Sequence, residues 1–261
     1  MKNIEVCVLN PQAVTEAEKM MVCAARLTQR GHNIKNMRDF LDLYEKPYTE
    51  STVENMCELP HPTIQKFEKI NVVITGASRR FLAQITRHQN EVKFMSASLQ
   101  YSDYSENGEE DNFTIPYELL DESKVLEREK YLTSCKRSME NYKDLVDSGV
   151  DNDTAGYEAP QGLRNVLIIS ATPYQWKHMI SQRTCRRNTN ETRYVMLAIW
   201  NELYKLAPSM FANAGPFCMN GPCKEGKMGC KYPMNKEFTP IDFLMQDYPL
   251  LYKNREELER N

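Results

Sequence analysis

Residues 84–88 read Gln-Ile-Thr-Arg-His and close an apolar stretch that predicts a helix over 78–88. Gln84, Arg87 and His88 are spaced i, i+3 and i+4, which places them on one face at the end of that helix. Arginine offers a planar fork for phosphate or carboxylate, and glutamine both donates and accepts hydrogen bonds. The spacing therefore indicates a site for an anionic, hydrogen-bonding ligand. It is also typical of a solvated helix end, where cations suit the helix dipole.

The remaining patterns predict one mixed α/β domain over residues 1–261. Val166-Leu-Ile-Ile-Ser170 is strand-like or a buried helix start, and residues 66–76 are rich in Ile and Val. Neither an internal repeat nor a linker interrupts the chain. Residues 2–9 are predicted as an edge strand, and helices are predicted over 15–31 (opened by a capping box at Thr15–Glu18), 36–46, 122–148, 173–183 and 190–206.

Composition limits the classes of function. Lys and Arg number 33 against 36 Asp and Glu, so no overall field would recruit nucleic acid. We find no signal-peptide run and no apolar stretch long enough to span a membrane. The eight cysteines are spread along the chain, which predicts reduced thiols and a cytoplasmic protein.

A second arginine-rich segment begins at Arg183. If this segment is helical, Arg183, Arg187 and Glu191 fall on one stripe. Such a stripe could bind an anion. It could equally be an exposed Arg187–Glu191 pair that contributes only a few tenths of a kcal/mol.

Two segments look less regular. Residues 103–114 are acidic and are predicted to be a flexible loop. Residues 212–233 are rich in Gly, Pro and Cys, and Cys218, Cys223 and Cys230 could join Cys185 or a histidine in a zinc site. The C-x2-C spacing of zinc knuckles is absent, so we expect a packed loop of reduced thiols and no metal, with redox chemistry as a further alternative.

Together, these motifs resemble the flavin-dependent thymidylate synthases. That family carries Arg-His-Arg, a seven-residue gap, Ser-x-Arg and usually Tyr-Ser. Here Arg87-His-Gln89 is followed, with one inserted residue, by Ser98-Leu-Gln-Tyr-Ser102. Further similarities are Pro60-His-Pro-Thr63 at the family's Gly-His-x-Ser/Thr, Gln182-Arg183 through Glu191-x-Arg193 at its second arginine motif, Ala24-Ala-Arg-Leu27 in an early helix, and a tail like that of a cysteine-bearing subset.

The resemblance implies a homotetramer with an α/β (α+β) fold, a mixed central sheet and flanking long helices. It implies that FAD binds between subunits, that NADPH reduces it, and that methylenetetrahydrofolate supplies the carbon that converts dUMP to dTMP. Carried over by position, the flavin-binding residues are Thr63, Arg87, His88, Gln89 and His178. The nucleotide-binding residues are Gln84, Arg87, Ser96, Ser98, Gln100 and Arg183.

Arg183 is the candidate catalytic residue. It matches the arginine thought to favour ionisation of the pyrimidine N3, where a fixed cation would stabilise the anion and make C5 more nucleophilic. The resemblance implies no protein nucleophile, and we find no nucleophile motif in the chain.

Several positions depart from the family pattern. Gln89 replaces the second arginine of Arg-His-Arg, and Gln100 and Gly156 stand where the family has nucleotide-contacting arginines. Ser96 stands at a usual glutamate and His178 at an asparagine. Two lost arginines remove charge-assisted bonds worth roughly 1.5–3 kcal/mol each. Four basic residues could compensate: Lys93, Arg164, Arg186 and Arg187.

Three functions therefore stay open from the sequence. The first is methylation of dUMP. The second is the same flavin chemistry on another pyrimidine nucleotide, for example dCMP, or C5-hydroxymethylation. The third is a non-catalytic tetramer whose Cys-rich tail binds a metal or a partner.

Overall fold

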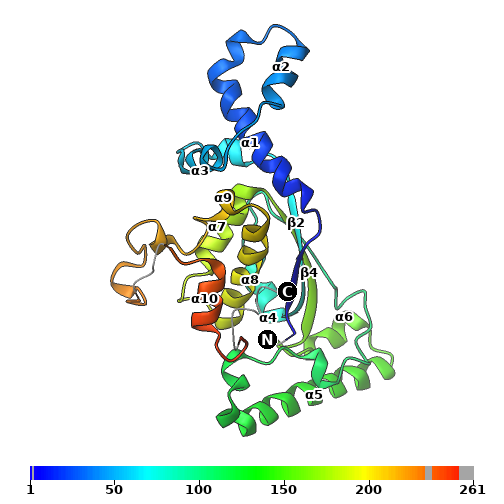
Figure 1. Ribbon diagram of the computed structural model, residues 1–261. Coiled ribbons are helices and arrows are strands. Elements are labelled where there is room, and N and C mark those ends of the chain that lie inside the picture. Colours follow the sequence, from blue (N-terminus) through cyan, green and yellow to red (C-terminus); the bar gives the residue numbers. More distant parts are fainter. Residues whose placement is uncertain (2, 233–236, 253–261) are drawn as a thin grey trace.

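A four-stranded antiparallel sheet forms the centre of the protein. The computed structural model describes residues 1, 3–232 and 237–252 (Figure 1). The strands, in the spatial order β1-β2-β4-β3, are β1 (Glu5–Val8), β2 (Ile70–Ser78), β4 (Arg164–Ala171) and β3 (Lys93–Ser96). β1 is the predicted edge strand, and 166–170 lies in a strand and not in a helix.

The expected mixture of parallel and antiparallel strands was wrong. β4 inserts between β2 and β3 and runs opposite to both, so each neighbouring pair is antiparallel. The chain reaches this central position only after a long excursion through α5 (Val125–Asp147).

Helices cover one face of the sheet. Along β4, Leu167 and Ile169 are buried and pack in the same core as Trp176 and Trp200, which come from α7 (Pro173–Arg183) and α8 (Asn190–Leu206). The alternate residues Val166 and Ile168 face the other way and are 47% and 38% exposed. The face of the sheet opposite the helices therefore carries apolar side chains that are only partly covered in the single chain.

The N-terminal helices form an arm that projects from the body (Figure 1). It consists of α1 (Gln12–Arg30) and α2 (Met37–Tyr44), which Asn36 caps. The predicted capping box at Thr15 was wrong, because α1 begins one turn earlier, directly after Pro11. Four further α-helices lay outside our predictions: α3 (Glu50–Glu58), α6 (Asn152–Ala155), α9 (Pro208–Phe211) and α10 (Pro240–Asp247).

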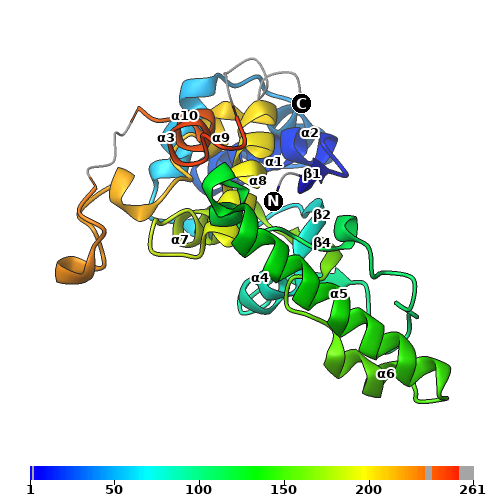
Figure 2. The same ribbon diagram turned by 90° about the horizontal axis from the view of Figure 1, so that it is seen from below.

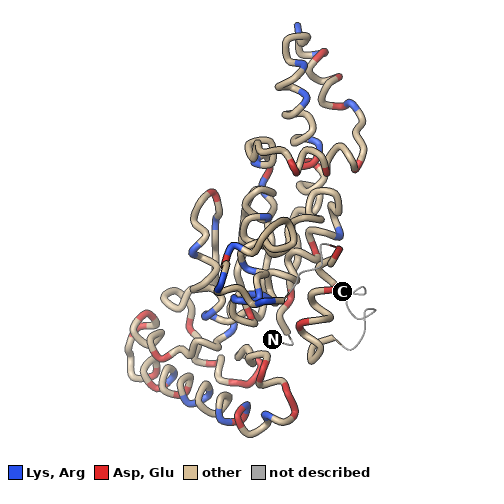
Figure 3. The backbone as a smooth tube through the Cα atoms, turned by 90° about the vertical axis from the view of Figure 1, so that its left-hand side faces the viewer, with Lys and Arg blue, Asp and Glu red and all other residues tan. Residues whose placement is uncertain are grey.

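The long charged helix α5 runs along the opposite end of the molecule, beside the short α6 (Asn152–Ala155) (Figure 2). Acidic and basic residues recur along it (Figure 3). Its apolar side, with Leu132, Met139 and Tyr142, forms a second core together with Phe113 and Leu163. Residues 103–114 form turns and the 3-10 helix η3 (Glu110–Asn112), and they end in this core at Phe113.

Short 3-10 helices connect the main elements. Besides η3, they are η1 (Gly31–Asn33), η2 (Pro62–Gln65), η4 (Tyr117–Leu120), η5 (Glu122–Lys124), η6 (Gly156–Glu158), η7 (Phe217–Met219) and η8 (Gly226–Met228).

Within the described residues, no helix combines the length and apolar character needed to cross a membrane.

Candidate functional site

Helix α4 (Arg79–Ile85) carries the first polar group of the site. Ser78 caps it, because its Oγ accepts from the backbone N–H of Phe81 at 3.2 Å. The helix ends at Ile85, so the prediction that it reaches His88 was wrong. Arg87 and His88 lie in the turn that follows, where the His88 N–H donates to the Ile85 carbonyl at 3.1 Å. Because Arg87 and His88 lie in this turn, their side chains do not share a helix face with Gln84, as the spacing had predicted they would.

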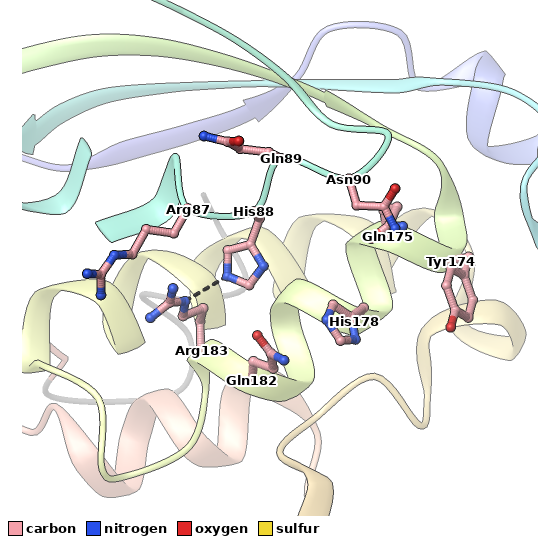
Figure 4. Close-up of a pocket in the computed structure, with 9 residues that line it drawn as sticks. All are labelled: Arg87, His88, Gln89, Asn90, Tyr174, Gln175, His178, Gln182 and Arg183. Atoms are coloured by element: carbon pink, nitrogen blue, oxygen red, sulfur yellow. Dashed lines mark hydrogen bonds between the residues drawn. The ribbon is translucent and has the colours of Figure 1, made fainter. Parts of the chain in front are cut away.

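Helix α7 supplies the facing wall. Pro173 occupies its first turn, as the sequence predicted, and Thr172 caps it. Tyr174, His178 and Gln182 repeat at i, i+4 and i+8, and Gln175 stands beside them. With the 87–90 turn they enclose a cavity of about 570 Å³ (Figure 4). Its full lining is Arg87, His88, Gln89, Asn90, Tyr174, Gln175, His178, Gln182 and Arg183.

Arg183 joins the two walls. Its Nε donates to His88 Nε2 at 2.8 Å, the bond drawn in Figure 4, and its Nη2 donates to the Gln84 carbonyl at 3.0 Å. Nη1 donates to Asn188 Oδ1 at 3.3 Å. Burial first, and then the charge of Arg87, lowers the pKa of Arg183. The guanidinium is thus fixed in position by three partners, and none of them is an acid.

His88 is neutral in this arrangement. Burial first, then Arg183 and His178, lower its pKa to about 4. Since Nε2 accepts from Arg183, the ring proton resides on Nδ1, which can donate to a ligand. The His178 ring lies 6.2 Å from the His88 ring, and burial and then Lys224 lower the pKa of His178 as well. Two neutral histidines therefore lie near Arg87 and Arg183, neither of which has an acidic partner among the described residues.

A network behind the cavity orients Gln84. Its Oε1 accepts from Thr192 Oγ1 at 2.9 Å and from Thr189 Oγ1 at 3.4 Å, at the start of α8. This leaves the amide nitrogen of Gln84 as the group that can donate to a ligand. The neighbouring Glu191 accepts from the N–H and from the Oγ of Ser78, both at 2.6 Å. Glu191 thereby ties the start of α8 to the start of α4.

The predicted stripe of Arg183, Arg187 and Glu191 was wrong. α7 ends at Arg183 and α8 begins at Asn190, so the intervening residues form a turn. Arg187 Nε lies 3.6 Å from Glu225 Oε2, and Arg187 also donates to the Met228 carbonyl. The Arg187–Glu191 pair that the sequence allowed is absent from the described interactions.

A second cavity, of about 470 Å³, adjoins the first and shares Gln182 and Arg183 with it. Cys185, Cys218 and Cys223 line it, and all eight cysteines of the chain are free thiols. Burial first, then nearby thiols including Cys185, raise the pKa of Cys218. Among the described residues, no three His, Cys, Asp or Glu side chains are arranged to hold a metal ion.

The predicted site residues fall into separate places. Arg87, His88, Gln89, His178 and Arg183 line the large cavity. Gln84 is outside the cavity lining, and only its backbone carbonyl is linked to the site, by accepting from Arg183.

The other predicted residues lie elsewhere. Ser96 ends β3, and Ser98 accepts from the Gln100 N–H at 3.1 Å in the turn beyond it, outside the cavity lining. Thr63 is exposed on η2, which packs against α7. One chain thus does not bring all the predicted residues to a single pocket.

Sequence reasoning missed several lining residues. Tyr174, Gln175 and Asn90 line the cavity with no motif to announce them, although the i, i+4, i+8 spacing of Tyr174, His178 and Gln182 was readable once α7 was predicted. The position of Asn90 depends on the turn after α4, which the sequence had extended as helix.

These features define an α/β protein with a cationic, amide-lined cavity at a helix–turn junction. A family model described as "Thymidylate synthase complementing protein" matches residues 12–209. The chain belongs to this family, whose curated relatives are named flavin-dependent thymidylate synthases.

Two of those relatives show how far their sequences differ from this chain. The protein of Geobacter sulfurreducens is 24% identical over 219 residues, covering 84% of this chain and 91% of the relative. That of Thermococcus kodakarensis is 29% identical over 178 residues, covering 65% of this chain and 71% of the relative. Both carry the name "Flavin-dependent thymidylate synthase".

Solved structures share the fold. Thymidylate Synthase X (ThyX) from Helicobacter pylori, determined with FAD and dUMP, superposes with a TM-score of 0.60 at 17% identity and covers 81% of this chain and 98% of its own. The UMP/dUMP methylase PolB from Streptomyces cacaoi, bound with 5-Br dUMP, gives a TM-score of 0.61 at 15% identity, with 81% and 94% coverage.

Proposed function

We propose that this protein is a flavin-dependent methyltransferase that converts dUMP to dTMP. Methylenetetrahydrofolate would donate the carbon and NADPH would reduce the flavin. The observation that carries the proposal is Arg183, a cation that three neutral partners hold in place between the cavity and Gln84. A cation fixed without a counter-ion is preorganised for negative charge that develops on a ligand.

The residues present fit a flavin dinucleotide. The Arg87 guanidinium lines the cavity, and no hydrogen bond or ion pair of it is found among the described residues. Gln89, Asn90 and Gln182 add amide donors and acceptors around the same space. Arg87 would hold the pyrophosphate, and Gln89, Asn90 and His178 would contact the polar edges of the group. A bound flavin supplies the hydride chemistry that side chains lack.

The chain's own residues would bind and polarise the pyrimidine. Arg183 would lie beside N3 and stabilise the anion there, which makes C5 more nucleophilic. The Gln84 amide nitrogen, left free by the bonds from Thr189 and Thr192 to its Oε1, would donate to a carbonyl of the base. His88, neutral at pH 7, would hold a proton on Nδ1 and keep Arg183 in position through Nε2.

We propose a homotetramer as the working form. Ser98 and Gln100 lie outside the cavity that Arg183 lines, so a nucleotide that meets both groups would have to bind between two copies of the chain. The sheet face with Val166, Ile168 and Met95 supports this, because these apolar side chains are 47%, 38% and 72% exposed in one chain.

A different pyrimidine nucleotide is the second candidate. Gln100 and Gly156 remove two expected arginines, and a structural neighbour, PolB, is a UMP/dUMP methylase. The same flavin site acting on UMP, dCMP or another 5′-phosphate would agree with both observations. C5-hydroxymethylation would use the same groups.

Spectroscopy and tritium release test the proposal. The purified full chain should bind FAD, seen as flavin absorbance that is retained after gel filtration. It should then release tritium from [5-³H]dUMP only when methylenetetrahydrofolate and NADPH are both present. A protein that retains no FAD would refute the flavin assignment, and release from [5-³H]dCMP or [5-³H]UMP alone would select the second candidate.

A further inference from the structure

We infer that Arg79 binds the phosphate group of the nucleotide, a role for which no sequence motif had singled it out. The inference rests on the proposed function, since it names the residue that would hold the anionic end of that substrate. Four cations of the chain could replace the arginines missing at positions 100 and 156.

Three of the four candidate replacements are already engaged. Arg164 donates to the Asn3 carbonyl at 2.6 Å and to the Asp111 carbonyl at 2.7 Å. Arg186 pairs with Asp247 at 2.7 Å. Arg187 binds Glu225 and the Met228 carbonyl, as described above. The fourth, Lys93, lies exposed on β3 at the edge of the sheet.

Arg79 differs from all of these. Its Nη1 is buried and has no hydrogen-bond partner among the residues the structure describes. No ion pair of Arg79 occurs in that part of the chain, and the nearby group that acts on its charge is the phenol of Tyr104. Burial lowers the pKa of this guanidinium, which shows that the charge is held at a cost.

A second unsatisfied group stands at the same strand crossing. The Arg79 N–H donates to the Leu163 carbonyl at 3.0 Å, and Asn165, two residues further along β4, opposes Ala77 of β2. Both polar atoms of the Asn165 side chain are buried without a partner among the described residues. The unsatisfied guanidinium nitrogen of Arg79 and the unsatisfied amide of Asn165 therefore belong to residues at one place in the fold, where β2 continues into α4.

This junction borders the turn on which the sequence placed the nucleotide. Leu99 and Tyr104 both pack on the second core, which contains Leu163. Leu99 also covers Gly156, where a Cβ atom would stand 3.2 Å from the Leu99 Cβ. A side chain at position 156 would therefore require Leu99 to shift by a few tenths of an ångström. Position 156 is thus crowded, whereas Arg79 keeps an Nη1 with no hydrogen-bond partner among the described residues.

Phosphate is the chemistry that satisfies Arg79. A buried charged donor without a partner is costly, and a phosphate oxygen accepts charge-assisted bonds from a guanidinium. The neighbouring Arg80 offers a matched control. It is exposed and lines a different cavity, with Thr189 and Gln161.

Paired titrations test the inference. The affinities of dUMP and of deoxyuridine, which lacks the phosphate, are measured by calorimetry on the FAD-loaded full chain. Arg79→Gln should weaken dUMP about 10- to 100-fold and leave deoxyuridine within about twofold, because only the phosphate loses charge-assisted bonds. Arg79→Lys should recover part of the loss, and Arg80→Gln should change neither affinity.

A stability measurement separates binding from structure. Arg79→Gln removes an uncompensated buried charge, so the melting temperature of the ligand-free protein should rise. A lower melting temperature, or an equal loss of dUMP and deoxyuridine affinity, would assign Arg79 a structural role and overturn the inference.

The two proposals fail in distinguishable ways. A wild-type protein that binds no pyrimidine nucleotide refutes the proposed function. Undiminished dUMP binding by Arg79→Gln refutes only the role of Arg79. If the wild type prefers UMP or dCMP, the same comparison of nucleotide with nucleoside applies to that base.

Discussion

Replacing Arg183 by Met removes the guanidinium and keeps most of the apolar stem. Three hydrogen bonds are lost: to His88 Nε2 at 2.8 Å, to the Gln84 carbonyl at 3.0 Å and to Asn188 Oδ1 at 3.3 Å. Bonds from a charged donor contribute roughly 1.5–3 kcal/mol each. Because the substitution also relieves the burial of an unneutralised cation, we expect the free energy of unfolding to fall by only about 1–3 kcal/mol in total.

His88 reports the change directly. Its pKa of about 4 is set by burial first, and then by the charges of Arg183 and His178. In Arg183→Met the pKa of His88 should rise and still stay below 6.5, because burial persists. The chain has four histidines, so proton NMR can follow the ring signal of each through a pH titration. An unchanged His88 pKa would refute the contact on which the proposed site depends.

The same shift makes stability depend on pH. The unfolded chain binds a proton at His88 near pH 6.5, and the folded chain only near pH 4. Between these values the unfolded state holds more protons, so the folded protein loses stability as the pH falls. The full difference corresponds to about 3.4 kcal/mol. Because the His88 side chain is partly exposed, solvent screening reduces the expected loss of stability to about 1–2 kcal/mol, and Arg183→Met should reduce this loss further.

Measurements of turnover test the proposed role of Arg183 in catalysis. Arg183→Met should lower kcat for dUMP by about 10²- to 10³-fold, the effect of removing one preorganised electrostatic donor, while FAD still binds. Arg183→Lys keeps the charge and loses the fork, so it should retain more activity than Met. Turnover that survives in the Met variant would reject the role of Arg183, and loss of FAD would show that the residue supports the cofactor site as well.

Two further substitutions probe the frame around the site, with chemical denaturation as the measurement. Asp247→Asn should lower the free energy of unfolding by about 3–5 kcal/mol, because Asp247 accepts from both Arg186 and Arg193, and the Arg193 side chain is only 5% exposed. A loss below 1 kcal/mol would contradict this. Gly162→Ala should cost about 1–3 kcal/mol, since its Cβ would stand 1.8 Å from the Tyr131 Oη and displace that ring; a neutral effect would show that the ring moves freely.

The sequence predicted those elements whose ends have local chemical causes. Pro173 and Thr172 begin α7, and the apolar period from 190 to 206 defines α8. The chain leaves α5 at Ser148, and Gly149 follows with a φ of 89°. Elements whose limits depend on distant contacts were predicted less well. Thr15 could have opened α1, and the helix instead starts after Pro11.

Missed helices have the same physical origin. α10 carries a capping box at Thr239 and Asp242, yet it is short, and its buried residues Phe243 and Leu244 pack on the core that α8 organises. A helix of this length is marginal alone and is stabilised by tertiary packing. Local sequence therefore could not establish that it forms.

By itself, the sequence determined the family and the chemistry of the side chains, because motif order and residue type survive without coordinates. Only the tertiary structure decided which groups meet. Arg183 reaches His88 across 95 positions, and Glu191 reaches Ser78 across 113, through contacts that no local period encodes. Gln84, Arg87 and His88 began as one helix face. The end of α4 at Ile85 instead sends Arg87 and His88 into the cavity and leaves Gln84 against α8. Burial, which belongs to the whole fold, then makes His88 neutral and leaves the Nη1 of Arg79 without a hydrogen-bond partner among the described residues.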